Sequence, residues 1–313
     1  MSRLVNVAVL DDYQHAALAS ADWSPLDGLA DVTVFSDHLA DEAALVERLR
    51  PFHAVCAMRE RTPFPRRVLE QLPNLELIAS TAPMNAAIDV TAASELGIAV
   101  AHTRYISTPT IEFTWALILA AARQIPAQTA CVRSGGWQVA VGEDLEGKTL
   151  GIAGLGRVGS GVARIAQAFR MELIAWSQNM TGARAQACGA KLVTKEELFA
   201  RADFVTIHLV LSDRTRGLVS AKELALMKPS AYLINSSRGP IVDDTALIDA
   251  LTNRRIAGAA LDAFAIEPLP ATHPYRSLPN VVATPHLGYV TRREYRLFFE
   301  DTVTNVAAWI ATR

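Results

Sequence analysis

Short apolar runs rich in β-branched residues alternate with amphipathic segments along almost the whole chain. In the first third, this pattern predicts strands at Val5–Leu10, Val32–Phe35, Ala54–Met58, Leu75–Ala79 and Ile98–Ala101. Helical periodicity over Glu42–Leu49 and Arg66–Leu72 separates some of these strands. Because strands that alternate with helices form βαβ crossovers, the pattern indicates a parallel sheet.

A second series of strands follows after a long helical stretch. It comprises Thr149–Ala153, Leu173–Trp176, Lys191–Val193, Phe204–His208, Ala231–Asn235, Gly258–Leu261 and Val281–Ala283. Two such series predict an α/β fold with two Rossmann-like or flavodoxin-like domains, each with a doubly wound parallel sheet, and a cleft between them. The amphipathic stretch Arg292–Ile310 is expected to cross back to the first domain. The predicted domains are therefore 1–101 plus 292–313, which is discontinuous, and 102–291.

The helical stretch between the two series, Thr110–Arg123, is nearly all apolar. A helix that is apolar on every side is expected to be buried on every side. Two interpretations fit this pattern. The helix either joins the domains through the core or is covered in part by a second subunit.

Composition and charge narrow the classes of function. Half of the 313 residues are hydrophobic, which is ample for packed cores, and the formal net charge is −2. Without a lysine- or arginine-rich tract, a general nucleic-acid or membrane surface is not expected, and no segment has the apolar length of a membrane span. Three dispersed cysteines, Cys56, Cys131 and Cys188, indicate thiols in a reducing cytoplasm. No cluster has metal-ligand spacing.

A glycine fingerprint, Gly154-Leu155-Gly156-Arg157-Val158-Gly159, lies between a predicted strand and a predicted helix over Val158–Arg170. In this context Gly154 permits a tight turn, Gly156 lets the backbone approach a pyrophosphate, and Gly159 lets the helix pack against the strand. The alternative is a simple glycine turn. The strand-to-helix context favours a dinucleotide site, with the phosphates at the helix N-terminus.

The residue that selects between NAD and NADP is expected about twenty positions after the glycines, at the end of the next strand. Here Ser177, Gln178 and Asn179 follow that strand, and the acidic residue that would bind the ribose of NAD is absent. Neutral donors tolerate a 2′-phosphate, but the nearest arginine is Arg184. The cofactor is therefore NAD or NADP, and the sequence leaves this choice open.

Three motifs near the C-terminus carry candidate chemistry: Ser236-Ser237-Arg238-Gly239, Asp262–Pro268 and Thr284–Gly288. Arg238 follows a predicted strand, where its guanidinium can bind a carboxylate in a bidentate way. His286 lies in a turn and can exchange a proton with a ketone or hydroxyl oxygen. Glu267 is expected to pair with His286 and favour its imidazolium form. The alternatives are a structural ion pair for Arg238 and an ordinary turn carboxylate for Glu267.

From about residue 50 to the C-terminus, the chain resembles the D-isomer-specific 2-hydroxyacid dehydrogenases. The resemblance rests on the glycine fingerprint, the segment Phe204–Thr215 and the three C-terminal motifs. It implies a catalytic set of Arg238, Glu267 and His286, a substrate domain made from both chain ends, an inserted dinucleotide domain, and a homodimer. It also implies that Asp262 contacts the nicotinamide carboxamide. The residues expected to contact the cofactor are Gly154, Gly156, Arg157, Val158, Gly159, Ser177, Gln178, His208, Leu209, Val210, Thr215, Ser236, Ser237, Asp262 and Gly288.

Two departures from the family pattern bear on the path of the loop after His208 and on the substrate. Val210 stands where the family commonly has proline. Ala82 and Pro83 stand in a substrate loop that is usually glycine-rich, and proline removes a backbone N–H donor. We expect Arg238, Pro83 and Met84 to contact the substrate.

The sequence thus predicts a cytoplasmic NAD(P)-dependent oxidoreductase that interconverts a small 2-keto acid and its D-2-hydroxy acid in the cleft between domains. Arg238 would bind the substrate, His286 would shuttle the proton, and Glu267 would tune His286. Within this class the alternatives are a phosphoglycerate-dehydrogenase-like enzyme and a glyoxylate/hydroxypyruvate reductase. From another class, an NADH-sensing co-repressor-like binding protein also fits.

Overall fold

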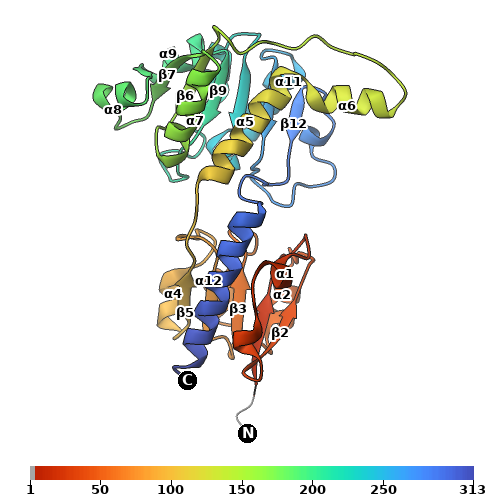
Figure 1. Cartoon of the computed structure of the whole chain (residues 1–313), viewed down its shortest axis with the longest axis vertical. Coiled ribbons are helices and arrows are strands. Elements are labelled where there is room, and N and C mark those ends of the chain that lie inside the picture. The colour runs from red at the N-terminus through yellow and green to blue at the C-terminus, as the bar shows by residue number, and fades with distance from the viewer. Residues whose placement is uncertain (1–3) are drawn as a thin grey trace. The chain divides into compact units, whose positions relative to one another are not determined.

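The computed structural model describes residues 4–313, which divide into two compact units. The first unit contains the described residues up to 106 together with 290–313, and the second contains 107–289. Figure 1 shows the first unit in red and orange with the blue terminal helix, and the second in yellow, green and light blue. The predicted first domain starts at residue 1, and residues 1–3 lie outside the described part.

The first unit is built on a parallel five-stranded sheet with the order β2-β1-β3-β4-β5. Its strands are β1 (Val5–Val9), β2 (Ala30–Val34), β3 (Ala54–Ala57), β4 (Leu77–Ser80) and β5 (Ala99–His102). The central strands β3 and β4 are short runs of small and branched apolar residues, and every residue in them is buried. Strands that are buried on both faces are typical of parallel sheets covered by helices on both sides.

Helices of the first unit follow the strands in sequence and close around the sheet. They are α1 (Ala17–Ser20), the 3-10 turn η1 (Ser24–Leu26), α2 (Glu42–Leu49), α3 (Arg66–Leu69), α4 (Val90–Glu95) and α12 (Arg292–Ile310). The long helix α12 buries one stripe, Tyr295, Phe298, Phe299, Val303 and Val306, which recurs every three or four residues. That stripe explains why the C-terminal segment belongs to a unit that begins 290 residues earlier in the chain.

The second unit is built on a parallel seven-stranded sheet with the order β12-β11-β10-β9-β6-β7-β8. Its strands are β6 (Thr149–Ala153), β7 (Glu172–Trp176), β8 (Lys191–Leu192), β9 (Phe204–Ile207), β10 (Tyr232–Asn235), β11 (Gly258–Leu261) and β12 (Val281–Ala283). Its helical elements are α5 (Thr108–Ala122), α6 (Ile125–Arg133), α7 (Arg157–Ala168), α8 (Gly182–Ala187), α9 (Lys195–Arg201), α10 (Ala221–Leu226), η2 (Gly239–Ile241), α11 (Asp244–Thr252) and η3 (Pro274–Arg276). Two apolar clusters form its core, one of which includes α5 and α7.

The α/β class and the parallel sheets are confirmed, and one predicted helix needs correction. The expected helix Arg66–Leu72 ends at Leu69, since Pro73 disfavours helical backbone in the residue before it. The central helix α5 is covered only in part by its own chain: Ala116 and Leu119 are exposed, and Trp115 and Ile118 are buried. The side of α5 that packs against the sheet is buried. The opposite side, with Ala116 and Leu119, is apolar and exposed to solvent. Its burial by a second subunit stays a prediction.

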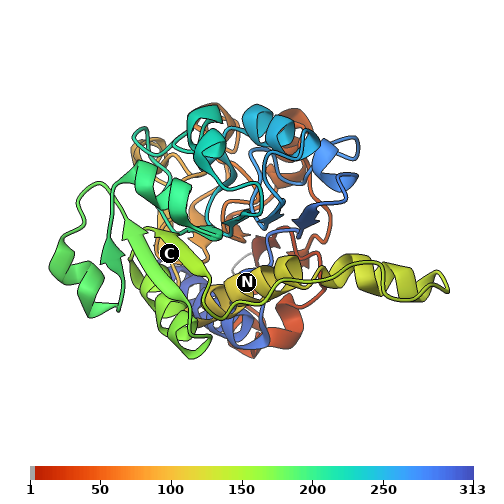
Figure 2. The same ribbon diagram turned by 90° about the horizontal axis from the view of Figure 1, so that it is seen from above.

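Figure 2 shows α6 and the chain that follows it projecting from the second unit. Within residues 4–313, no helix is long and apolar enough to cross a membrane. In the same residues, no group of histidine, cysteine and carboxylate side chains could hold a metal ion.

Candidate active site

The strand order of the second sheet reverses between β6 and β9, which are neighbours although β7 and β8 separate them in the sequence. In open α/β sheets, ligands bind beyond the carboxyl ends of the strands at such a reversal. The loops after β6 and β9 touch there: a Cβ on Gly154 would lie 2.6 Å from the backbone oxygen of His208. Gly154 also has φ +100°, which favours glycine. The glycine fingerprint therefore lies at the reversal of strand order.

The first turn of α7 is open toward this point. Gly156 is the N-cap, no side chain caps the helix, and nothing lies within 4 Å of the position that a Cβ of Gly156 would take. By contrast, a Cβ on Gly159 would lie 2.0 Å from the oxygen of Gly154, so helix and turn pack only without a side chain. Exposed Arg157 and half-buried Val158 complete the turn. Free N–H groups and the helix dipole make this turn fit a dinucleotide pyrophosphate.

The carboxyl end of β7 lies beside the glycine turn, because the oxygen of Trp176 accepts the N–H of Gly154 at 2.8 Å. Half-buried Ser177 and exposed Gln178 follow directly. No aspartate or glutamate occurs in residues 173–190. This edge therefore presents neutral hydrogen-bonding groups at the position where a ribose would be recognised.

The loop after β9 forms the other side of the reversal. His208 lies within 2.9 Å of the Thr206 hydroxyl, and burial lowers the pKa of His208 to about 4, so its ring is neutral at neutral pH. The Thr215 hydroxyl donates to the oxygen of Val210 (2.7 Å) and accepts from the N–H of Ser212 (2.8 Å). Thr215 therefore fixes the path of this loop without the family's proline, and it leaves Val210 exposed.

The Arg238 loop begins directly after β10 and is held by short polar contacts. The Asn235 side chain accepts from the N–H of Ser237 and donates to the oxygen of Arg238, both at 3.0 Å. The Ser237 hydroxyl donates to the oxygen of Leu209 at 2.5 Å. Half-buried Arg238 donates from Nη1 to the oxygen of Ser237 at 2.8 Å. The loop after β9 and the Arg238 loop are thus joined.

The Arg238 loop also packs against the segment that carries Glu267. A Cβ on Gly239 would lie 2.1 Å from the backbone carbon of Phe264, so only glycine permits this approach. Glu267 in turn accepts the N–H of Phe264 on Oε1 (2.8 Å) and contacts Nδ1 of His286 through Oε2 (2.7 Å). The structure therefore pairs Glu267 with His286 directly, and it connects Arg238 to that pair through the backbone.

The loop that carries His286 is held by one buried carboxylate. Asp262, which is 1% exposed, accepts from the Thr284 hydroxyl and from the N–H groups of Leu287 and Gly288, all at 2.7 Å. Burial raises the pKa of Asp262, and these three donors and His286 oppose that effect. His286 itself has φ +55°, an unfavourable backbone conformation for a residue with a side chain. Strain of this kind persists only where the surroundings impose it.

The His286 ring has one nitrogen engaged and one left for chemistry. Nδ1 contacts Glu267, and the ring meets Tyr289 edge-on with 5.5 Å between centroids. Tyr289 is buried, so it packs against the histidine. Such an arrangement fixes the ring orientation and directs Nε2 away from the carboxylate. The site can therefore exchange a proton at Nε2.

The predicted substrate loop lies in the first unit, and two of its backbone donors are already engaged. Thr81 donates its N–H to the oxygen of Ala57 (3.0 Å), and Ala82 donates to the Thr103 hydroxyl (2.8 Å). Pro83 has no N–H to offer. Pro83 and Met84 are exposed, and the Met84 side chain presents an apolar surface. The residues 81–83 therefore offer no free N–H to a carboxylate.

Several supporting residues escaped prediction. Thr114 on α5 places its hydroxyl 2.9 Å from that of Ser236. Arg184 on α8 donates to the oxygen of Leu155 in the glycine turn. Thr103, whose hydroxyl accepts the N–H of Ala82, is a third residue that was not predicted. These contacts join residues 21 to 122 positions apart, and no local motif signals them.

The second unit therefore combines a dinucleotide-type turn with a carboxylate–histidine pair, as expected of a nicotinamide-dependent oxidoreductase. The family model of the D-isomer specific 2-hydroxyacid dehydrogenase NAD binding domain matches residues 115–288. A glyoxylate reductase of Aeropyrum pernix is 44% identical over 235 residues, which cover 72% of this chain and 70% of that protein. A D-3-phosphoglycerate dehydrogenase of Methanocaldococcus jannaschii is 40% identical over 241 residues, 76% of this chain but only 46% of that protein.

Among solved structures, a phosphoglycerate oxidoreductase from Vibrio cholerae has a TM-score of 0.94 and 37% identity, and the match covers 99% of this chain and 100% of that one. The chain belongs to the D-isomer specific 2-hydroxyacid dehydrogenase family. It is an oxidoreductase that interconverts 2-keto acids and D-2-hydroxy acids with a nicotinamide dinucleotide.

Proposed function

We propose that this enzyme acts on a small 2-keto acid of the glyoxylate or hydroxypyruvate type, with Arg238, Glu267 and His286 as its catalytic residues. The observation that carries the proposal is the 2.7 Å contact between Glu267 Oε2 and His286 Nδ1, which leaves Nε2 for the substrate oxygen. The match covers 70% and 76% of two curated glyoxylate reductases, and 46% and 48% of two curated phosphoglycerate dehydrogenases.

The residues divide the work according to their chemistry. The nicotinamide ring, when bound, supplies or receives the hydride at the substrate carbon. Arg238 binds the substrate carboxylate through its planar guanidinium. His286 donates a proton from Nε2 to the ketone oxygen during reduction and removes it during oxidation. Glu267 holds the ring and stabilises the imidazolium by its charge. In this proposal Arg238 is the main side chain for the carboxylate, and Pro83 and Met84 line the substrate.

We propose further that residues 107–289 bind the cofactor and that the first unit supplies the substrate loop. The glycine turn at Gly154, Gly156 and Gly159 holds the pyrophosphate, with Arg157 and Val158 beside it. The adenosine ribose lies against Ser177 and Gln178. The remaining cofactor contacts come from the segments at the reversal of strand order, namely His208, Leu209, Val210, Thr215, Ser236, Ser237, Asp262 and Gly288.

The test follows oxidation of NADH and NADPH against glyoxylate, hydroxypyruvate, pyruvate, phenylpyruvate and branched-chain keto acids. His286→Ala should lower turnover by about 10²- to 10⁴-fold, since it removes the acid–base group, while dinucleotide binding stays close to wild type. Wild-type turnover in His286→Ala would overturn the assignment of His286.

A phosphoglycerate-type activity is the second candidate, because a phosphoglycerate oxidoreductase shares the fold over nearly the whole chain. Oxidation of 3-phosphoglycerate, in preference to reduction of the small keto acids, would establish it. Dinucleotide-dependent binding of a protein partner without turnover of any acid would instead favour the co-repressor-like function.

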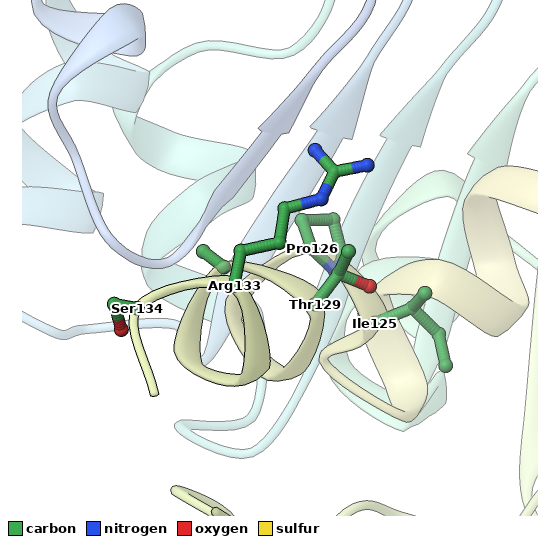
Figure 3. Close-up of a pocket in the computed structure, with 6 residues that line it drawn as sticks. Ile125, Pro126, Thr129, Arg133 and Ser134 are labelled. Atoms are coloured by element: carbon green, nitrogen blue, oxygen red, sulfur yellow. The ribbon is translucent and has the colours of Figure 1, made fainter. Parts of the chain in front are cut away.

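We also propose a cytoplasmic homodimer. The three cysteines are free in the structure, as suits a reducing compartment. The projecting segment that starts at α6 exposes large apolar side chains: Ile125, Val132, Trp137, Val139 and Val141. A shallow hollow on α6, lined by Ile125, Pro126, Thr129, Ala130, Arg133 and Ser134, lies on the same segment (Figure 3). Contiguous apolar surface of this kind marks protein interfaces.

The dimer is tested by sedimentation of Trp137→Asp combined with Val141→Asp. We expect a monomer, because two charges would enter the interface, whereas Leu18→Asp in the first unit should leave the mass of the assembly unchanged. A wild-type chain that sediments as a monomer would rule the dimer out.

A further inference from the structure

The glycine turn is contacted by a guanidinium from the helix that follows β7. Arg184, the third residue of α8, donates from Nε (3.2 Å) and Nη2 (2.8 Å) to the oxygen of Leu155. Leu155 stands between the first two glycines of the turn, and Figure 1 shows α8 on the β7 side of the sheet. A long side chain from a separate helix is therefore anchored at the turn that fits the pyrophosphate.

The chain between β7 and α8 is short and turns back toward the glycine turn. Met180 donates its N–H to the oxygen of Ser177 (3.1 Å), which closes a turn directly after β7. The Thr181 hydroxyl then accepts the N–H of Arg184 (3.3 Å) and starts α8. Since Trp176 already bonds to Gly154, Arg184 and Ser177 both flank the glycine turn. A ribose bound at the end of β7 would lie within this arrangement.

The charge of Arg184 is not balanced by a neighbouring acid. Within residues 4–313, no ion pair involves Arg184, and its side chain is exposed. Two contacts to one carbonyl use only part of its five N–H donors. Residues 173–190 contain no carboxylate that would repel a phosphate. An open cation beside neutral Ser177 and Gln178 is suited to an additional phosphate.

We propose that Arg184, with Ser177 and Gln178, binds the 2′-phosphate of NADP(H) and makes it the preferred cofactor. The inference rests on the proposed cofactor site. It selects between NAD and NADP, a choice that the residues after β7 leave open. The guanidinium keeps the Leu155 carbonyl through Nε and meets the phosphate with its remaining N–H groups. Ser177 and Gln178 add neutral donors.

The experiment measures binding and not turnover. Dissociation constants of NADPH, NADH, 2′,5′-ADP and 5′-AMP are determined by calorimetry for the wild type, Arg184→Ala and Arg184→Lys. The control is Arg164→Ala, an exposed arginine on α7. Thermal unfolding checks that each variant is folded. The wild type should bind NADPH and 2′,5′-ADP at least about tenfold more tightly than NADH and 5′-AMP, as expected of a charge-assisted contact.

Arg184→Ala should remove most of that preference and weaken NADPH binding far more than NADH binding, because for NADH only the contact of Arg184 with Leu155 is lost. Arg184→Lys should keep part of the preference, and Arg164→Ala should keep all of it. Equal losses for NADPH and NADH would show that Arg184 only holds the glycine turn and would overturn the proposal, as would tighter binding of NADH by the wild type. Absence of keto-acid turnover would count against the proposed function and leave this binding result intact.

Discussion

The carboxyl edges of the two sheets differ in how many of their polar groups are free. At the edge of the five-stranded sheet, Thr81 and Ala82 donate their N–H groups within the protein, and the Asp12 carboxylate accepts from Ala16 and Ala17. At the edge of the seven-stranded sheet, the first turn of α7 has no side-chain cap. Both sheets place loops at the same kind of edge, but the second presents the uncapped first turn of a helix there, which is suited to a phosphate.

The charged side chains at the two edges differ in the same way. In the first unit, Asp11 accepts from the Thr62 hydroxyl (2.6 Å) and contacts His38 (2.9 Å), and Arg61 donates to the oxygen of Asp11 (2.6 Å). In the second unit, Glu267 and His286 form a pair whose side chains are 31% and 20% exposed. An edge whose groups satisfy one another supports shape, whereas an edge with open groups supports binding and proton transfer. The difference supports the proposal that proton transfer takes place at the second edge.

The largest effect on stability and on dinucleotide binding is expected when Gly159, at the start of α7, is replaced by alanine. Gly159→Ala places a Cβ 2.0 Å from the oxygen of Gly154, so helix or turn must move. Overpacking of this kind costs about 1–3 kcal/mol or more of unfolding free energy and should abolish dinucleotide binding. Urea unfolding and calorimetric titration with NADH measure the two effects.

Gly156→Ala is the matched substitution in the open part of the same turn. Nothing lies within 4 Å of its Cβ position, so the unfolding free energy should change by less than about 1 kcal/mol. Binding of NADH should still weaken clearly, because the methyl group occupies the approach of the pyrophosphate. Unimpaired binding in Gly156→Ala would mean that the cofactor does not use this turn.

The next effect concerns Asp262, whose carboxylate holds the His286 loop. Asp262→Asn keeps one acceptor oxygen for three donors, so the loop should loosen and kcat should fall about tenfold or more. If Asp262 acts by positioning, the dissociation constant of NADH should remain within about threefold of the wild type. A rise in that constant without a fall in kcat would instead support a direct contact with the nicotinamide carboxamide.

Much of this architecture could be predicted from residue patterns. The strands Thr149–Ala153, Gly258–Leu261 and Val281–Ala283 have the predicted bounds, as does α12 (Arg292–Ile310). Their signals are local: short apolar runs for the strands, and a stripe of period 3.6 for the helix. The pairing of Glu267 with His286 was also expected, since each lies in a motif of recognisable chemistry that begins directly after a predicted strand.

The supporting contacts could not be predicted in this way. Asp262 reaches Leu287 and Gly288 across 25 and 26 positions, and Thr103 reaches Ala82 across 21. Such bonds depend on which strands become neighbours and on the path of each loop, which a single motif does not encode. Which side of α5 its own chain covers could not be predicted, for a related reason. An apolar pattern records what a helix can bury, and the surrounding chain decides which side is covered.

A smaller effect is expected at the edge of the five-stranded sheet. Thr103→Val removes the hydroxyl that accepts the N–H of Ala82, and an unpaired buried donor costs about 1–3 kcal/mol of unfolding free energy. Thr304→Val on the exposed side of α12 should cost less than about 0.5 kcal/mol. Urea unfolding compares them. If Thr103→Val proves as stable as Thr304→Val, the edge is not held by this bond.

Activity sharpens the same comparison. Thr103→Val should raise KM for the keto acid, because the loop with Pro83 and Met84 loses an anchor, while the dissociation constant of NADH stays unchanged. Loss of NADH binding in this variant would contradict the assignment of the two edges to different ligands.

The smallest effect is a pH dependence in the first unit. Glu294 on α12 is fully buried and accepts the N–H of Ile106 at 3.2 Å. Burial raises its pKa to about 7, against the opposing influence of that hydrogen bond, Arg59 and Arg293. Because the unfolded chain has the lower pKa of 4.5 for this group, the folded state binds more protons between pH 4.5 and 7. The contribution of Glu294 to stability is therefore complete below pH 4.5 and is lost as the pH rises through 7.

Glu294→Gln should remove that loss, because its amide stays neutral and can still accept from Ile106. The difference in unfolding free energy between Glu294→Gln and the wild type should grow by about 1–3 kcal/mol between pH 4.5 and 8. Glu300→Gln, an exposed carboxylate on the same helix, should show no such trend. A pH-independent difference for Glu294→Gln would mean that Glu294 is ionised in its buried position and balanced by Arg59. The first unit would then hold a buried charge pair. Its polar groups would bond to one another even more completely, in contrast to the accessible groups at the edge of the seven-stranded sheet.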